Sequence, residues 1–158
     1  LLQALARKTF YETYVEKNTA ENMNMYISEV FSLEQIRAEL VDSTSKFYLI
    51  EKNKLALGYT KLNLKPCAAW QNKSESGLEI ERIYVDANYQ GQGIGKILLM
   101  HAEEVAKYFS CRYMWLGVWQ ENANAIQFHK KNKFEIVGTH TFTLGLDNQC
   151  DWLMAKAV

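Results

Sequence analysis

Three glycines at alternate positions, Gly91, Gly93 and Gly95, separate a strand pattern at 78–85 from a helix pattern that begins at Ile94. Ordering glycine costs more backbone entropy than ordering any other residue, so such a cluster marks a place where something approaches the main chain closely. A helix that begins directly after a strand also points free N–H groups and the positive end of its dipole at an anion. The sequence therefore predicts a phosphate-binding turn.

Two common phosphate motifs do not fit this turn. A P-loop has Ser or Thr after its lysine, but Ile97 follows Lys96. The dinucleotide motif G-x-G-x-x-G would need a third glycine where Lys96 or Leu98 stands, counting from Gly91 or Gly93. The ligand is therefore a phosphate compound of another kind.

Hydrophobic periodicity predicts the order ααα, ββ, βα, βα, ββ in one domain over 1–158. The first 45 residues are helical, with a capping box that begins at Ser32, and a hairpin with its turn at Asn53 and Lys54 occupies 47–64. Residues 67–77 are expected to be irregular, followed by strands at 78–85, 112–119, 134–144 and 150–155 and a short helix at 122–131. The helix after the glycines is expected to bury one face, formed by Ile94, Ile97, Leu98, Val105 and Phe109.

Composition narrows the class of protein. Charge balances to zero, with 18 basic and 18 acidic residues, which argues against a broad nucleic-acid surface, and no apolar run approaches the roughly 20 residues that cross a bilayer. Cys67, Cys111 and Cys150 form no C-x-x-C pattern, so we expect buried thiols, no disulfide framework, no metal and a cytoplasmic location.

Two motifs resemble one family. Residues 90–95, Gln-Gly-Gln-Gly-Ile-Gly, match Q/R-x-x-G-x-G/A, and residues 122–134 resemble N-x-x-A-x-x-F-Y-x-x-x-G-F. In this order they resemble the GNAT family of acetyl-CoA-dependent N-acetyltransferases. The resemblance extends over nearly the whole chain to the PaiA-type polyamine acetyltransferases, through 78–85, 115–119, 122–131, Met154-Ala-Lys156 and Asn22-Met23.

The resemblance implies an α/β fold with a mixed, mostly antiparallel twisted sheet, flanked by helices and containing a central splayed pair of parallel strands. A further N-terminal strand of the family is expected ahead of Leu1. The implied reaction is direct transfer of the acetyl group from acetyl-CoA to a small-molecule primary amine, with spermidine or spermine favoured, and a homodimer is left open. The alternatives are an enzyme acting on a peptide amine and a non-catalytic acyl-CoA-binding sensor or scaffold.

The family motifs assign the cofactor residues. The backbone of Ile83, Tyr84 and Val85 would pair with the pantetheine arm like an added strand. The amides of 90–96 would hold the pyrophosphate: Gln90, Gly91, Gln92, Gly93, Ile94, Gly95 and Lys96. Across the cleft, Asn122, Asn124, Ala125 and His129 would complete the site.

Two positions depart from the family pattern, which has Tyr at His129 and Gly at Lys133. The tyrosine is thought to protonate the departing thiolate. A histidine with a pKa of about 6.5 can do the same in its charged form. The alternative is a histidine on the helix surface with no part in the reaction.

An amine must lose its proton before it attacks the thioester, so a base is required. Glu79 and Glu81 are expected on one face of the strand before the glycines and are the candidate bases. The alternative for either residue is an ion pair with Arg82 or a place on a solvated strand face. An acyl-enzyme on cysteine is disfavoured because no cysteine adjoins a histidine in sequence.

Residues 1–45 carry seven acidic and four basic side chains, a net charge of −3. Solvated helix faces explain this excess in general terms. The sharper interpretation is an acidic entrance that attracts a cationic acceptor, with Glu12 and Glu16, one helical turn apart, as substrate-binding residues.

Overall fold

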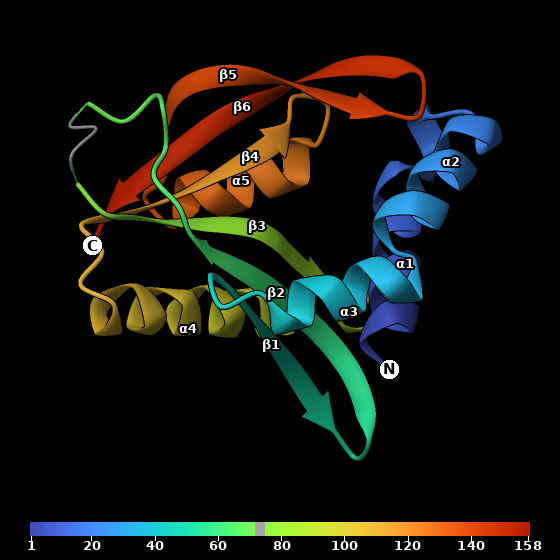
Figure 1. Cartoon of the computed structure of the whole chain (residues 1–158), viewed down its shortest axis with the longest axis horizontal. Helices are drawn as coiled ribbons and strands as arrows, with labels where there is room; N and C mark the ends of the chain where they lie inside the picture. The colour runs from blue at the N-terminus through green and yellow to red at the C-terminus, as the bar shows by residue number, and fades with distance from the viewer. Residues whose placement is uncertain (72–74) are drawn as a thin grey trace.

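The computed structural model describes residues 1–71 and 75–158 and contains a six-stranded sheet in the order β1-β2-β3-β4-β6-β5 (Figure 1). The strands are β1 (Ser45–Lys52), β2 (Leu55–Leu64), β3 (Gly77–Val85), β4 (Tyr113–Trp119), β5 (Glu135–Leu144) and β6 (Asp147–Ala157). The helices are α1 (Leu2–Tyr14), α2 (Ala20–Val30), α3 (Leu33–Val41), α4 (Ile94–Tyr108) and α5 (Ala123–Lys131), with short 3₁₀ turns η1 (Val15–Lys17) and η2 (Ala87–Tyr89). The predicted order of elements is confirmed. The prediction of an irregular 67–77 covers 72–74, which lie outside the described residues.

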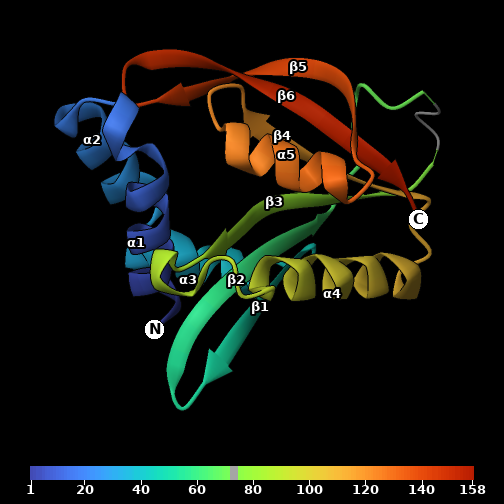
Figure 2. The ribbon, with the colours of Figure 1, turned by 180° about the vertical axis from the view of Figure 1, so that it is seen from behind.

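The sheet is antiparallel except between β3 and β4, which are parallel. These two strands pair only through Gly77–Glu79 and Tyr113–Trp115 and then diverge, as Figure 2 shows. Beyond Glu79, β3 keeps β2 as its partner but has none on its other side. The predicted splayed parallel pair is confirmed.

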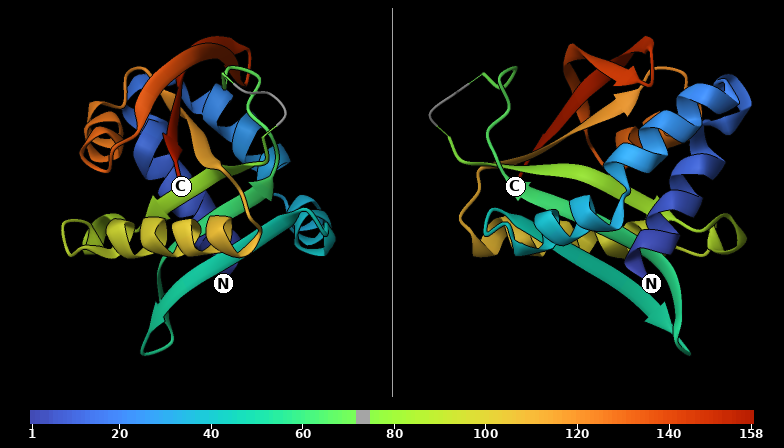
Figure 3. Two further views of the ribbon diagram at one scale, coloured as in Figure 1. Left: turned by 90° about the vertical axis from the view of Figure 1, so that its left-hand side faces the viewer. Right: turned by 45° about the vertical axis from the view of Figure 1, so that its right-hand side comes forward.

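Helices cover both faces of the sheet. In Figure 2, α4 and α5 lie in front of the sheet, where Leu99, Ala102 and Phe134 pack against Leu116 and Met154. The left view of Figure 3 shows α4 and α3 on opposite sides of the β1–β2 hairpin. A second apolar cluster joins α1, α2 and α3 to β2 and β5. The helical first quarter of the chain thus forms the cover of the second face.

Local signals place several of these elements. Thr19 Oγ1 accepts from Asn22 N and caps α2, and Ser32 Oγ accepts from Gln35 N at 3.1 Å and caps α3. The capping box is only half formed, because the Gln35 side chain donates to Glu39 instead of turning back to Ser32.

Two predictions about burial are wrong. Ile97 is 55% exposed and Phe109, which caps α4, is 37% exposed, so the buried face of α4 is formed instead by Leu98, Leu99, Ala102, Val105 and Ala106, together with Ile94. Cys67 and Cys111 are buried as expected, but Cys150 on β6 is exposed.

Candidate active site

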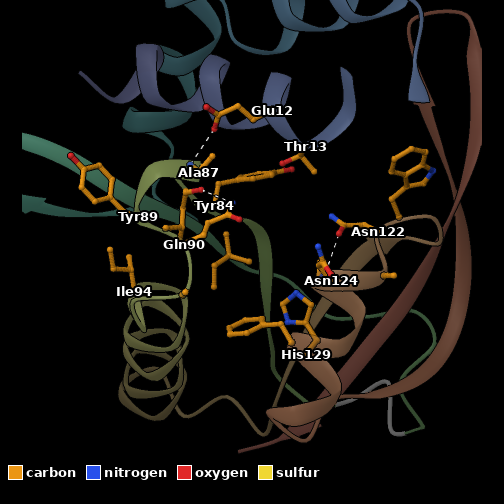
Figure 4. Close-up of a pocket in the computed structure, with 18 of the residues that line it drawn as sticks. Glu12, Thr13, Tyr84, Ala87, Tyr89, Gln90, Ile94, Asn122, Asn124 and His129 are labelled. Carbon is orange, nitrogen blue, oxygen red and sulfur yellow. Dashed lines mark hydrogen bonds between the residues drawn. The ribbon is translucent and has the colours of Figure 1, made fainter. Parts of the chain in front are cut away.

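A cleft of about 810 Å³ opens where β3 and β4 diverge, between the start of α4, α5 and the last turn of α1 (Figure 4). Most of the predicted site residues line it: Glu12, Glu16, Ile83, Tyr84, Val85, Gln90, Gly91, Gly93, Ile94, Gly95, Lys96, Asn122, Asn124, Ala125 and His129. Gln92, Glu79 and Glu81 do not belong to this lining. Three segments far apart in the sequence therefore meet around one opening.

The glycine turn takes a conformation that other residues adopt at a cost. Gly91 has φ 76° and Gly93 has φ 82°, both in the left-handed region that favours glycine. A Cβ atom at either position would meet nothing within 4 Å, so the space beside the main chain is open. Gly93 caps α4 without a side-chain bond, so the first N–H groups of the helix are available to a ligand. This geometry suits an anionic phosphate.

The end of β3 offers main-chain groups to the cleft. Val85 O accepts a hydrogen bond from Gln90 Nε2 at 3.2 Å, which ties the turn back to the strand. A carbonyl oxygen has two lone pairs, so this bond leaves room for a second donor. Gln90, the first residue of the motif, thus supports the turn.

The α5 side of the cleft begins with a cap. Asn122 Oδ1 accepts from Ala125 N at 3.1 Å, which fixes the first turn of α5. This bond uses one lone pair of the Asn122 oxygen and leaves the other for a ligand. The Nδ2 group of Asn122 remains as the donor on this side.

His129 is buried in the wall of the cleft and is 4% exposed. Its ring lies edge-on to the rings of Phe128 and Phe134, and its Nδ1 has no hydrogen-bond partner among the described residues. Burial lowers the pKa of His129 to about 4. The alternative of a surface histidine is wrong, and with this pKa the imidazole is neutral at pH 7, so the charged form assumed from the sequence is scarcely populated.

Lys133, the other departure from the family pattern, has φ 70° just after the end of α5. This is the position where helices commonly place a glycine in the left-handed conformation. The family's glycine is thus explained by backbone geometry, and here a lysine adopts the same conformation.

Glu12 and Glu16 reach the cleft from α1 and η1, so they are not on one continuous α-helix. Glu12 Oε2 accepts from Ala87 N at 3.3 Å, so this side chain helps to hold α1 against η2, and Glu12 Oε1 lies 3.6 Å from Lys8 Nζ. Glu16 is exposed at the entrance. Of the predicted acidic pair, Glu16 is the one with no such structural contact among the described residues.

Glu79 and Glu81 point away from the cleft, on the face of the sheet opposite α4. Asn63 Nδ2 donates to both, at 2.8 Å and 2.6 Å. Glu81 pairs with Lys61 at 2.7 Å and with Arg82 at 3.1 Å. Neither carboxylate lines the cleft, and the ion pair with Arg82, the alternative for Glu81, is present.

Sequence reasoning missed several residues of this region. Thr13, Trp119 and Glu121 also line the cleft, and Lys17 Nζ lies 2.9 Å from Glu121 Oε2 at its entrance. They belong to neither of the two family motifs. Among the described residues, no group of three or more His, Cys, Asp or Glu side chains could hold a metal ion, and no helix is long and apolar enough to cross a membrane.

Comparison with known proteins gives consistent findings. Residues 5–134 match the model of the Acetyltransferase (GNAT) family. An uncharacterized N-acetyltransferase of the pepI 3′ region in Lactobacillus delbrueckii subsp. lactis is 34% identical over 155 residues, which cover 98% of this chain and 89% of that protein.

Two comparisons involve Thermoplasma acidophilum. Its spermidine N(1)-acetyltransferase is 27% identical over 139 residues, which cover 85% of this chain and 81% of that protein. The crystal structure of its PaiA N-acetyltransferase in complex with coenzyme A superposes with a TM-score of 0.79 at 24% identity, and the match covers 99% of this chain and 91% of that one. The latter match shows the same fold.

Proposed function

Because the chain belongs to the acetyltransferase (GNAT) family, we propose that its N-acetyltransferase reaction moves the acetyl group of acetyl-CoA to a polyamine such as spermidine or spermine. The observation that carries the cofactor assignment is the pair of left-handed glycines, Gly91 and Gly93, at the start of α4, with open space beside them. We take residues 1–158 as one such domain.

The donor would lie along the cleft. Its pyrophosphate would be held by the free N–H groups at the start of α4, where the helix dipole favours negative charge. Its pantetheine arm would pair with the unpartnered edge of β3 at Ile83–Val85, and this would bring the thioester between β3 and β4. Asn122, Asn124 and Ala125 would contact it from the α5 side.

Transfer would then proceed by direct attack. The lone pair of the neutral amine forms a bond to the acetyl carbon, the C–S bond breaks, and the electron pair stays on sulfur. His129 is the group we assign to the sulfur side. Its neutral ring can donate a hydrogen bond, and the negative charge that develops on sulfur favours the protonated ring as the bond breaks.

Two observations support a polyamine acceptor. A relative at 27% identity bears the name spermidine N(1)-acetyltransferase, and acidic side chains, Glu12, Glu16 and Glu121, lie around the entrance of the cleft. A polyamine keeps a positive charge on its other nitrogens while one nitrogen reacts, so such carboxylates would attract and orient it.

A thiol-release assay with acetyl-CoA tests the proposal, using spermidine, spermine, a neutral-tailed monoamine of similar length and a short peptide with a free N-terminus. We expect the polyamines to have the highest kcat/KM at low salt, with an advantage that shrinks as ionic strength rises. Equal or better rates with the peptide or the monoamine would contradict the polyamine assignment and leave a general N-acetyltransferase.

The second candidate function is a non-catalytic acyl-CoA-binding module. The buried, neutral His129 in place of the family's tyrosine is the observation that favours it. This candidate predicts tight acetyl-CoA binding in calorimetry with no thiol release from any amine of the panel.

A further inference from the structure

An exposed glycine, Gly117, lies in the middle of β4 on the face of the sheet opposite α4 and α5, and we call the exposed surface above it the hollow. Gly117 is exposed there, although its neighbours Leu116 and Val118 on one face and Trp115 and Trp119 on its own face are buried. Alternation along a strand places Trp115, Gly117 and Trp119 on the same face. The missing side chain of Gly117 therefore opens the sheet surface to solvent between two tryptophans.

Two aromatic contacts cover this face of β4 on either side of the hollow. At one end, the α1 residue Tyr14 packs on Trp119, with ring centroids 5.2 Å apart. At the other end, Trp70 stacks on Tyr113 at 4.3 Å. Trp119 and Tyr84 also line the cofactor cleft, so the hollow lies next to the place where β3 and β4 diverge.

Asp151 on β6 and His140 on β5 form one wall of the hollow. A Cβ atom on Gly117 would lie 3.2 Å from Asp151 Oδ2 and 3.2 Å from His140 Cε1, so both side chains face the space above this glycine. Asp151 is 8% exposed, and its Oδ1 has no hydrogen-bond partner among the described residues. Its Oδ2 lies 3.9 Å from His140 Nδ1. A buried carboxylate oxygen without a partner is costly, which points to a ligand with a positive charge or a donor group.

The surroundings raise the proton affinity of the Asp151 carboxylate. Burial raises the pKa of Asp151 to about 6, and His140 acts in the opposite direction. The other titratable groups that face it are Tyr14 on α1, Tyr26 on α2 and Tyr84 on β3. Burial raises the pKa of all three tyrosines and the charge of Asp151 adds to this, so they stay uncharged. Of the described groups around this carboxyl, His140 is the one that can carry a positive charge.

Resting on the proposed function, we propose that Asp151 binds the ammonium group of the acceptor above Gly117 and takes its proton. One N–H bond of the ammonium breaks as an O–H bond forms on Asp151, and the freed lone pair attacks the acetyl carbon. The adduct's remaining surplus proton passes from nitrogen to the departing sulfur, and the proton on Asp151 returns to solvent. An ammonium and the thioester thus become an amide, a thiol and one released proton.

Asp151 suits this role better than Glu79 or Glu81. Both glutamates accept from Asn63 and pair with cations, Lys65 at 3.6 Å for Glu79 and Lys61 for Glu81. With a pKa of about 6, Asp151 makes proton transfer from an amine of pKa near 10 roughly a hundredfold less unfavourable than an ordinary aspartate does.

The test compares Asp151→Asn with Asp147→Asn, the same substitution on the same strand but at an exposed site. The probe is spermidine with acetyl-CoA, and kcat/KM is measured as a function of pH while calorimetry reports acetyl-CoA binding. In the wild type the rate should rise through a pKa near 6 and then level. Asp151→Asn should lose roughly 10²-fold or more at pH 7 and show instead a rate that keeps rising toward the amine's own pKa of about 10. Acetyl-CoA affinity should not change, and Asp147→Asn should match the wild type.

Gly117→Ala provides a second variant that keeps both ionisable side chains but crowds them, because its Cβ atom would lie 3.2 Å from Asp151 Oδ2 and 3.2 Å from His140 Cε1. Its methyl group would occupy the hollow, so KM for spermidine should rise while acetyl-CoA binding is kept. Wild-type pH profiles for Asp151→Asn, with active wild-type protein, would overturn the role of Asp151 and leave the proposed function intact. A wild type that releases no thiol with any amine would overturn the proposed function, and the role of Asp151 with it.

Discussion

Lys17 Nζ and Glu121 Oε2 lie 2.9 Å apart and join η1 to the loop before α5 across the entrance of the cleft. Both side chains are more than half exposed, so the pair contributes less than about 1 kcal/mol to stability. We expect the two charges to affect binding of the acceptor amine instead. Lys17→Gln removes a positive charge from the entrance and should lower KM for spermidine, whereas Glu121→Gln should raise it. Steady-state kinetics at low and high salt check this, since salt should shrink both effects.

Glu16 should act in the same direction as Glu121. Glu16→Gln should raise KM for spermidine without changing acetyl-CoA affinity, because it removes an exposed charge that makes no hydrogen bond to the turn before α4. Glu12→Gln should also alter acetyl-CoA binding, because Glu12 accepts from Ala87 N. Calorimetry with acetyl-CoA on both variants distinguishes attraction of the acceptor from support of the turn, and an unchanged KM for spermidine in Glu16→Gln would contradict the acidic entrance.

Gly93→Asp should largely abolish acetyl-CoA binding. The side chain would project into the open space beside the turn, its charge would repel phosphate, and φ 82° would be strained for any residue except glycine. Gly93→Ala is the matched control, because it carries the backbone strain, about 1 kcal/mol or more, but adds no charge. Calorimetry on folded protein should show a much larger loss of acetyl-CoA affinity for Gly93→Asp than for Gly93→Ala. Equal losses would contradict a pyrophosphate site at this turn.

His129 should make stability depend on pH in a known direction. Its pKa is about 4 when folded and about 6.5 when unfolded, so the unfolded chain binds more protons between these values. The contribution is fully present above pH 6.5 and is lost as pH falls toward 4, about 2 kcal/mol between pH 7 and pH 5. Denaturant unfolding of wild type and His129→Phe at both pH values measures it, with the difference between the two proteins as the readout.

Turnover tests the catalytic assignment of the same residue. His129→Ala should lower kcat much more than acetyl-CoA affinity, and His129→Tyr should keep activity. Equal kcat for wild type and His129→Ala at every pH would assign this histidine to packing alone.

Lys133→Gly should stabilise the protein. Lys133 holds φ 70°, which costs a lysine about 1 kcal/mol relative to a residue without a Cβ atom, and its side chain is exposed. The gain should be somewhat smaller because glycine also gains freedom in the unfolded chain. Lys131→Gly, inside α5, is the control that should destabilise. Thermal unfolding of the two variants gives opposite shifts in Tm if the backbone explanation holds.

The sequence predicted those parts of the fold and cleft that depend on local signals. The strand, the glycines and the helix that follow one another at 78–96 are contiguous, so their geometry can be inferred from their order. The burial of His129 could not be inferred from the sequence, because it depends on Phe134 and on the way α5 packs. The pKa of His129 could not be inferred either, since burial lowers it. Ile97 fits the helical period of its neighbours, but the buried stripe of α4 is centred one residue further along, on Leu98 and Leu99.

Polar contacts between residues far apart in the sequence could not be predicted either. Glu81 was a candidate base, but it contacts Lys61 and Asn63 on β2. These two residues approach Glu81 only when the hairpin pairs with β3. Asp151 and His140 belong to no motif, and only the β5–β6 pairing brings them together. A glycine inside a buried strand, Gly117, was the one local hint of the space that they share.

The brief pairing of β3 with β4 also has a mechanical consequence. Three residue pairs at one end are the backbone ladder that joins β1-β2-β3 to β4-β6-β5, so beyond Glu79 side-chain packing holds the two halves of the sheet together. A ligand that bonds along the free edge of β3 and touches α5 would add a second polar link between these halves. Amide hydrogen exchange should then slow on both sides of the gap, including strands that no ligand atom touches.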